Sequence, residues 1–335
     1  MARILCFGEI LLRLAATGGD LLVQSRSLAV HVGGAEANVA AALAQLGHDA
    51  AVLSILPDSR LGDAAVSALG ARGVDTRRIA RRPGRMGLYF FEPGAGARAG
   101  EIVYDRAGSA FADGLGTAVW DDALPGGGWL HLSGITPALT AVAANATLAL
   151  ARAARAAGLR VSFDCNYRPS LWQASGGDAP TILGALAAEA DLLFGNYRDA
   201  ALLTGAAFDG DGPERRRAAA EALFAAFPNL TTIASTSRHV DGADTHRLSA
   251  RIDTPDDVVQ LDETALTGIV DRIGGGDAFA AGVLHGLATG GDPARAARLG
   301  LAAAVQKHFI SGDVWIGDAA GLDAFVIGGT GDIRR

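Results

Sequence analysis

Short apolar runs alternate with alanine-rich helical stretches along most of this chain. Each run is bounded by turn-forming residues, and its length suits a buried strand better than a helix. The runs are RILCFG, AVLSIL, WLHLSG, RVSFDC, DLLFGN and TTIAST. Because strands separated by helices join into βαβ units, the alternation predicts an α/β fold, with a mostly parallel central sheet flanked by helices on both faces.

Two segments interrupt this rhythm and predict a second, smaller sheet. GLYFFEP and GEIVYDR are joined by a glycine-rich turn, which is typical of an antiparallel hairpin. We predict that residues 11–31 and 85–110 form a small β-sheet lid, because inserted strands often cover a ligand crevice. An ordinary edge hairpin is the alternative. The chain has no linker long enough to separate independent domains, so we predict a single domain, 1–335, that carries this lid.

Composition narrows the classes of protein to consider. The formal charge of −7 and the absence of a Lys/Arg run of the kind that tracks phosphates argue against a nucleic-acid-binding surface; RRRAAAEALFAAF is better interpreted as a solvated helix face. No charge-free apolar span of about 18 residues predicts a transmembrane helix, and the start MARILCFGEILLRL lacks the pattern of a signal peptide. The two cysteines, Cys6 and Cys165, lie in apolar strand-like segments and predict buried thiols. These features predict a cytoplasmic protein without nucleic-acid or membrane partners.

The run DRIGGGDAFAAG, residues 271–282, places adjacent glycines before a stretch with helical spacing. Glycine is costly to order, and a structural turn rarely needs so many. The free N–H groups and the dipole at a helix N-terminus bind anions. Gly274, Gly275 and Gly276 therefore predict an anion-binding loop. Asp277 can either cap the helix or accept a proton from a group bound beside the anion.

A second helix that opens on glycines is predicted at GGAEANVAAALAQLG, residues 33–47. Val39 and Leu43 belong to its apolar stripe, and Gly47 is a typical C-terminal stop. Asn38 lies in the first turns as a polar residue. By itself the stretch is a weak signal, because an asparagine there often binds only the local backbone.

Taken together, the two glycine-opened stretches resemble the paired signatures of the ribokinase-like (PfkB) carbohydrate kinases. The resemblance covers nearly the whole chain and implies a Rossmann-like, ribokinase-type fold. It implies that Gly274, Gly275 and Gly276 form the anion hole, that Gly274 and Gly276 also contact ATP, and that Asp277 is the catalytic base. FGEILLRL, VYDRAGSA, HLSGITPAL and SFDCNYRPSLW look most like the 2-keto-3-deoxygluconate kinases within the family. The implied reaction is ATP-dependent phosphorylation of this sugar acid to its 6-phosphate.

A keto-sugar acid carries a carboxylate, and its predicted site contains arginines. Asp164, Asn166 and Arg168 follow the end of a predicted strand, where ligands bind in open parallel sheets. The planar fork of Arg168 suits a carboxylate. The other candidates for substrate binding are Gly33, Gly34, Asn38, Tyr89, Tyr104, Arg106 and Asp313. The alternatives are that Arg168 pairs with a nearby acid, that the tyrosines pack the lid, and that Asp313 lies in a solvated turn.

The nucleotide and metal side is predicted from two further stretches. FGNYRDA resembles the Asn-x-x-Glu motif that acts near Mg²⁺ and the phosphates in this family; Asn196 matches, but Asp199 replaces the glutamate. Because the aspartate is one methylene shorter, we expect it to reach the metal through water. Asn196 can equally be the N-cap of the next helix. STSR, residues 235–238, follows a strand end and resembles the stretch that these kinases place near the nucleotide, which implies that Ser237 and Arg238 bind ATP. The implied cofactors are ATP and Mg²⁺, with a monovalent-cation requirement left open.

Other functions remain open at this point. A kinase for a neutral sugar such as fructose or ribose would leave Arg168 and Arg106 without a carboxylate. A nicotinamide oxidoreductase would need G-x-G-x-x-G after the first strand, whereas the chain has GEILLRLAATGG there. A non-catalytic sugar or nucleotide sensor is the third alternative, and the presence of Asp277 in a glycine loop argues against it. The exposed edge of the hairpin predicts a homo-oligomer formed through the lid.

Overall fold

The computed structural model describes residues 1–335 except 118–119, 121–123, 125, 210–211 and 329–335. Its main sheet runs in the order β13-β12-β11-β10-β9-β8-β1-β4-β5, with β14 paired to β12. The strands are β1 (Arg3–Phe7), β4 (Asp49–Pro57), β5 (Ile79–Arg82), β8 (Trp129–Ser133), β9 (Arg160–Asp164), β10 (Leu192–Phe194), β11 (Thr232–Gly242), β12 (Thr245–Asp253), β13 (Val258–Gln260) and β14 (Thr264–Thr267). Each apolar run named above forms one of these strands, and the predicted fold class is confirmed.

The sheet is parallel from β5 to β11 and antiparallel beyond it. The long strand β11 turns back into β12, which pairs on its other side with β13 and β14. The alternation of strands with helices ends here, because the strands of this region are joined by short turns. The sequence prediction stopped at TTIAST and did not include these antiparallel strands.

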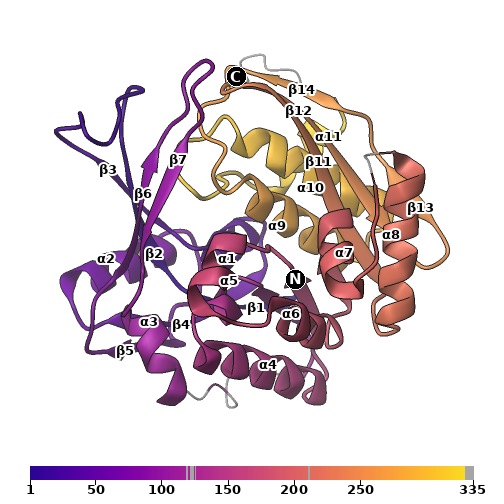
Figure 1. Cartoon of the computed structure of the whole chain (residues 1–335), viewed down its shortest axis with the longest axis horizontal. Helices are drawn as coiled ribbons and strands as arrows, with labels where there is room; N and C mark the ends of the chain where they lie inside the picture. The colour runs from indigo at the N-terminus through magenta and orange to yellow at the C-terminus, as the bar shows by residue number, and fades with distance from the viewer. Residues whose placement is uncertain (118–119, 121–123, 125, 210–211, 329–335) are drawn as a thin grey trace.

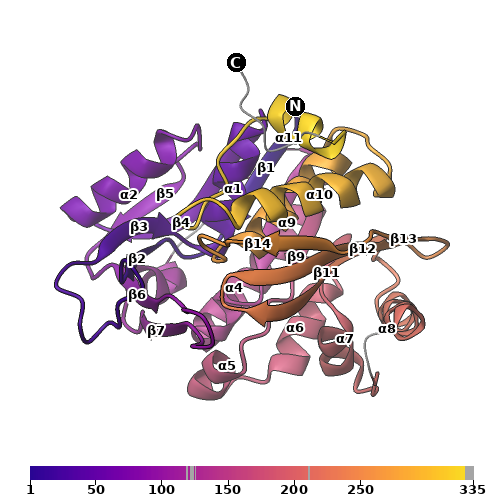
Figure 2. The same ribbon diagram turned by 90° about the horizontal axis from the view of Figure 1, so that it is seen from above.

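Helices cover both faces of the main sheet (Figure 1, Figure 2). They are α1 (Ala35–Gln45), α2 (Arg60–Gly70), α3 (Ala110–Gly114), α4 (Ala141–Ala156), α5 (Pro169–Ser175), α6 (Ala179–Ala187), α7 (Tyr197–Thr204), α8 (Pro213–Ala226), α9 (Gly275–Ala288), α10 (Pro293–Lys307) and α11 (Ala319–Val326), with short 3-10 turns η1 (Leu115–Thr117) and η3 (Thr136–Ala138). Figure 2 shows α1, α9 and α10 on one side of the sheet and α4, α6 and α7 on the other.

Because both faces are covered, the central strands are buried on each side. In β1, Ile4 and Cys6 pack into one hydrophobic cluster, whereas Leu5 and Phe7 pack into the other. This explains why the strands appear in the sequence as unbroken apolar runs rather than as alternating patterns. Cys6 and Cys165 are both free thiols and both buried, as predicted.

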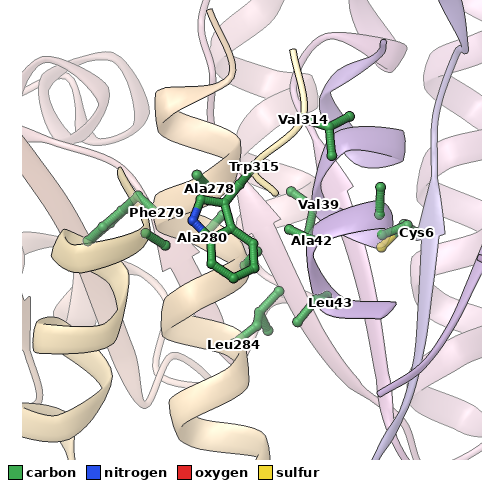
Figure 3. Packing of buried hydrophobic residues seen from close by; sticks show 14 of the residues in the cluster. Cys6, Val39, Ala42, Leu43, Ala278, Phe279, Ala280, Leu284, Val314 and Trp315 are labelled. Carbon is green, nitrogen blue, oxygen red and sulfur yellow. The ribbon is translucent and has the colours of Figure 1, made fainter. Parts of the chain in front are cut away.

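Helices α1 and α9 lie against each other and share a core with the segment after α10. Figure 3 shows Trp315 between Val39 and Leu43 of α1 and Ala278 of α9. The side chain of Gln45 donates a hydrogen bond of 2.9 Å to the carbonyl of Trp315, which fastens this segment to α1. The packing brings the N-termini of both glycine-opened helices to the same region of the molecule.

A second sheet of four strands stands beside the main one, in the order β3-β2-β6-β7 (Figure 2). Its strands are β2 (Leu11–Ala15), β3 (Ala29–Gly33), β6 (Gly87–Glu92) and β7 (Glu101–Asp105). β6 and β7 form the predicted antiparallel hairpin, and β2 pairs in parallel with β6. The second sheet is confirmed; its action as a lid, and the division of the chain into a single domain with an insertion, stay predictions. Across the described part of the chain, no helix has the length and apolarity needed to cross a membrane.

The contact between α9 and α10 generates a prediction about stability. A Cβ added at Gly282 of α9 would lie 2.8 Å from the Gly300 Cα of α10, closer than packed atoms approach. We expect Gly282→Ala to lower the free energy of unfolding by roughly 1–3 kcal/mol through overpacking. Equilibrium unfolding in urea measures this change in the free energy of unfolding.

Gly184 of α6 is the matched control, because nothing lies within 4 Å of a Cβ added there. Alanine is the better helix former by about 1 kcal/mol, so Gly184→Ala should leave stability unchanged or raise it. Equal unfolding midpoints for the two variants would contradict the close approach of α9 to α10.

Candidate active site

A cleft of about 670 Å³ lies where the small sheet faces the carboxyl ends of the central strands. Residues just after β9 and β10 line it, together with the glycine loop before α9 and side chains from β6 and β7. The candidates that line it are Gly34, Asn38, Tyr89, Tyr104, Arg106, Asn166, Arg168, Asn196, Arg238, Gly274, Gly275, Gly276, Asp277 and Asp313. The structure therefore brings most of the predicted site together, although these residues lie far apart in the sequence.

The glycine loop presents free N–H groups at the start of α9. Gly274 has a φ of 81°, a conformation that favours glycine, and a side chain there would collide with the Asp313 carbonyl. The N–H of Gly275 donates to the Arg272 carbonyl at 3.2 Å. The N–H groups of Gly276 and Asp277 have no partner among the described residues. These groups, with the helix dipole, form a site suited to an anion.

Asp277 does not cap its helix. Gly274 is the N-cap of α9 and no side chain bonds to it, so the capping alternative is wrong. The Asp277 carboxylate instead accepts a hydrogen bond of 2.7 Å from the side-chain amide of Asn38. Burial raises the pKa of Asp277 to about 7, the Asn38 bond opposes this, and the Glu36 carboxylate adds to it. A carboxyl with this pKa can accept a proton near neutral pH.

Asn38 joins the two glycine-opened helices rather than bonding to its local backbone. Its side chain extends from α1 to Asp277 of α9, and it is buried. Its Oδ1 atom is buried without any partner in the described part of the chain. Since a buried acceptor without a donor is costly, this atom is suited to a donor supplied by a ligand, such as a hydroxyl.

Asp164 places a second carboxyl in the cleft. Burial, with the nearby carboxylates of Asp277 and Asp199, raises the pKa of Asp164 to about 8. One of its oxygens accepts a hydrogen bond of 3.1 Å from the Asn166 N–H. Among the described residues no cation pairs with it at ion-pair distance, which leaves this carboxyl available to a bound cation.

The two candidate arginines differ in their partners. Arg168 is exposed, and its side chain makes no hydrogen bond or ion pair within the described ranges, so the alternative of an acid partner is wrong. The Arg106 guanidinium is buried and contacts one oxygen of Glu9 at 2.8 Å and 2.5 Å. Ser109 donates to the other Glu9 oxygen at 2.5 Å. Arg106 lines the cleft with its charge already balanced, and its contact with a substrate stays a prediction.

Asp313 and Tyr89 belong to a buried network that the sequence did not predict. The Tyr89 hydroxyl donates to Asp313, and burial raises the pKa of this tyrosine above its usual range. Arg13 of β2 lies 3.0 Å from Asp313 and 2.8 Å from Asp271. Asp313 is buried, so the solvated-turn alternative is wrong. Tyr104 is half exposed in the cleft, with its ring 5.9 Å from that of Tyr89.

The glycines at the start of α1 are explained by close packing. A side chain at Gly33 would collide with the Asp313 carboxylate, and Gly33 does not itself line the cleft. Gly34 has a φ of 139°, and a side chain there would collide with the Glu9 carbonyl. A role for either residue in binding substrate stays a prediction.

Asn196 and Asp199 form a capping box at the start of α7. The Asn196 side chain accepts from the Arg198 N–H at 2.9 Å, and Asp199 accepts from the Asn196 N–H at 2.8 Å. The N-cap alternative for Asn196 is therefore confirmed. Asp199 is buried and does not line the cleft, and burial raises its pKa. Contact of either residue with a metal stays a prediction.

Ser237 faces a neighbouring cavity rather than the main cleft. It accepts a hydrogen bond of 2.9 Å from Arg216, and it lines a cavity of about 200 Å³ that Asn196 and Arg238 also line. Arg238 thus borders both cavities, and the second one adjoins the cleft. This arrangement leaves room for a ligand longer than a sugar, and the nucleotide contact of Ser237 stays a prediction.

Several residues of the site were not predicted from the sequence. Glu9, Glu36 and Arg272 all line the cleft. Arg13 and Asp271 do not line it but form a buried ion pair next to it. The available signal was charge inside apolar sequence, as in FGEILLRL, where a glutamate and an arginine interrupt a buried strand pattern. Such residues are buried only when partners from distant segments balance them.

Comparisons with known proteins show similarity over nearly the whole chain. Residues 1–309 match the model of the pfkB family carbohydrate kinases. A 2-dehydro-3-deoxygalactonokinase from Haloferax volcanii is 33% identical over 338 residues, covering 100% of this chain and 99% of that protein. A 2-dehydro-3-deoxygluconokinase from Bacillus subtilis is 34% identical over 204 residues, covering 59% of this chain and 61% of that protein. The crystal structure of a 2-dehydro-3-deoxygluconokinase from Thermotoga maritima has a TM-score of 0.93 at 34% identity and covers 98% of this chain and 100% of that one.

Proposed function

Since this chain belongs to the pfkB family of carbohydrate kinases and is a sugar kinase, we propose that it transfers the terminal phosphoryl group of ATP to 2-keto-3-deoxygluconate. The product is the 6-phosphate, formed at the primary hydroxyl. The observation that carries the proposal is the presence, in one cleft, of a carboxyl with a pKa near neutrality and an arginine without a protein partner. The first is Asp277 and the second is Arg168.

Asp277 acts as the general base. Its carboxylate accepts the proton of the sugar hydroxyl while the hydroxyl oxygen forms a bond to the terminal phosphorus and the bond to the leaving ADP oxygen breaks. The free N–H groups of Gly276 and Asp277 stabilise the negative charge on the transferring phosphoryl group. Asn38 holds the carboxylate at 2.7 Å and offers its unpartnered oxygen to a substrate hydroxyl.

Arg168 recognises the carboxylate of the sugar acid. Its guanidinium lines the cleft beside Asn166 and has no competing acid partner among the described residues. A planar fork that is free on both edges can bind a carboxylate through two charge-assisted hydrogen bonds. Tyr104, half exposed in the same cleft, supplies a further hydroxyl from the small sheet.

The kinase family implies Mg²⁺ with ATP, and the residues of the cleft fit this ion. Mg²⁺ prefers oxygen ligands and keeps several waters, and the Asp164 carboxyl and Asn196 side chain both face the cleft. Asp164 has no cation partner at ion-pair distance within the described residues, and Asp199 would act through Asn196, whose N–H it holds at 2.8 Å. When bound, the ion neutralises phosphate charge.

The small sheet acts as the lid of this site in our proposal. Tyr89, Tyr104 and Arg106 reach the cleft from β6, β7 and the residue after β7. The turn of the same hairpin meets the β11–β12 turn, where the Ala243 N–H donates to the Gly96 carbonyl at 3.1 Å. The small sheet therefore also contacts the antiparallel end of the main sheet. Assembly of a homo-oligomer through this sheet, a cytoplasmic location and the monovalent-cation requirement stay predictions.

The epimer 2-keto-3-deoxygalactonate is the second candidate substrate. The relative from Haloferax volcanii, a 2-dehydro-3-deoxygalactonokinase, is similar over the whole chain and favours it. Both epimers carry the carboxylate that Arg168 would bind, so this residue does not distinguish them. A neutral sugar such as fructose or ribose would leave Arg168 without a partner and is disfavoured for that reason.

Replacing the proposed base tests the chemistry. Asp277→Asn should keep the Asn38 contact and the fold while turnover falls by about 10² to 10⁴, the usual contribution of a positioned general base. The wild-type kcat/KM should fall as the pH drops below about 7, because the protonated carboxyl cannot accept the hydroxyl proton. Steady-state rates over a pH series measure both effects.

Asp256→Asn is the matched control, since Asp256 is exposed between β12 and β13 and lies outside the cleft. This variant removes the same charge and should keep wild-type turnover. Near-normal turnover in Asp277→Asn would remove Asp277 from the reaction.

Replacing Arg168 tests the substrate class. Charge-assisted hydrogen bonds contribute roughly 1.5 to 3 kcal/mol each, so Arg168→Ala should raise the KM for 2-keto-3-deoxygluconate tenfold or more. The KM for ATP should stay nearly unchanged, and turnover of neutral sugars should be poor in both proteins. The measurement is kcat/KM for the keto acid, its galacto epimer, fructose and ribose. If fructose or ribose were the best substrate of the wild type, the neutral-sugar alternative would replace the sugar acid.

A further inference from the structure

Three arginines without protein partners line the cleft around the glycine loop. Arg168 precedes α5, Arg238 lies in β11, and Arg272 lies just before the loop that opens α9. All three are exposed to the cleft, and no side-chain hydrogen bond or ion pair joins any of them to a described residue. By contrast, Arg13 and Arg106 are held by carboxylates. The cluster is therefore a concentration of positive charge in which no guanidinium is held in an ion pair by a described residue.

The lack of partners does not come from a shortage of acids. The chain has a formal charge of −7, and Asp271 directly precedes Arg272 in the sequence. The Asp271 carboxylate is turned away, however: it accepts from the Ile273 and Gly312 N–H groups at 3.0 Å each and pairs with Arg13 at 2.8 Å. Arg272 therefore has no ion pair with the neighbouring Asp271, whose carboxylate binds Arg13 and two backbone N–H groups.

Gathering like charges costs free energy in the unliganded protein. Partial desolvation by the walls of the cleft, followed by the charges of Arg272 and Arg168, lowers the pKa of Arg238. The same positive field contributes to lowering the pKa of His308, after burial, through Arg238 and Arg272. A cluster with this cost is typical of a site that binds a ligand with several negative charges.

Arg272 is the member of the cluster nearest to the anion-binding N–H groups along the chain. Its carbonyl accepts from the Gly275 N–H at 3.2 Å, which fixes its backbone against the glycine loop. Arg238 borders the neighbouring cavity with Asn196 and Ser237, whereas Arg168 lies with Asn166 after β9. Arg272 adjoins the loop where, in the proposed function, the phosphoryl group passes between nucleotide and sugar.

We propose that Arg272 and Arg238 bind the phosphate chain of the nucleotide, and that Arg272 contacts the phosphoryl group during its transfer. This inference rests on the proposed function. A sugar acid brings one carboxylate, which Arg168 takes, whereas a nucleoside triphosphate brings several charges and planar oxygen pairs that suit guanidinium forks. Because Arg272 contacts the transferring group, it is a catalytic residue. Arg238 contacts only the phosphate chain and is a binding residue.

Inorganic tripolyphosphate isolates the phosphate chain from the base and from the sugar. Its affinity, measured by isothermal titration calorimetry on the full chain with Mg²⁺ present, should fall tenfold or more in Arg272→Met and in Arg238→Met. Arg272→Lys keeps the charge without the fork and should lose less. The kcat of Arg272→Met should fall tenfold or more, while the KM for the sugar should stay within about twofold, because the residue touches the phosphoryl group rather than the sugar.

Arg60→Met is the matched control: Arg60 is exposed at the start of α2 and lies outside both cavities. It should bind tripolyphosphate like the wild type, and the urea midpoints of all variants should agree. Wild-type tripolyphosphate affinity in Arg272→Met, or no binding by the wild-type protein, would overturn the inference. A loss of affinity in Arg272→Met supports it even if the enzyme prefers a neutral sugar, so failure of the sugar-acid assignment remains distinguishable.

Discussion

The buried ion pairs of Arg13 connect the small sheet to the glycine loop, and the geometry of the cleft depends on this connection. Arg13 comes from β2, lies 2.8 Å from Asp271 and 3.0 Å from Asp313, and is almost fully buried. Breaking a buried pair by removing one partner costs roughly 3–5 kcal/mol, because an uncompensated charge remains. Asp271 also accepts the Ile273 and Gly312 N–H groups, so the same carboxylate shapes the backbone on both sides of the site. The Lys307 ammonium links the two segments that flank the site, because it donates to the Ile310 carbonyl at 2.8 Å and to the Asp271 carbonyl at 3.3 Å.

The cleft contains two kinds of charged group that do not pair with each other, buried carboxyls and exposed guanidiniums. Burial raises the pKa of Asp277 and of Asp164 even though the nearby charge of Arg168 lowers both, so each carboxyl can accept a proton or a metal ion. Guanidiniums that form no ion pair with a described carboxylate remain available to anions, as at Arg168 and Arg272. A protein optimised only for stability would pair such groups with each other. Their separation in one cleft is what a phosphoryl transfer between two anionic substrates needs.

The sequence predicted those features that depend on local pattern. Buried strands and the hairpin of β6 and β7 follow from periodicity and from turn chemistry, which act over a few residues. The grouping of Asp277, Asn38 and Arg168 followed from the resemblance of two glycine-opened helices to a family. The pairing of Arg106 with Glu9 and of Arg13 with Asp271 was not predicted, because each joins segments whose proximity exists only after folding. Asn196 illustrates the converse: one local pattern fits both a cap and a metal contact, and the structure shows the cap.

The central claim is that the cleft at Asp277 phosphorylates the primary hydroxyl of a keto-sugar acid. Proton-coupled ³¹P NMR of the product formed from ATP, Mg²⁺ and 2-keto-3-deoxygluconate tests this claim most directly. The account predicts ADP and one new phosphate monoester whose resonance is split into a triplet by the two protons of the terminal CH₂ group. A doublet from a secondary carbon, or ADP formed without any new ester while fructose or ribose is phosphorylated, would contradict it.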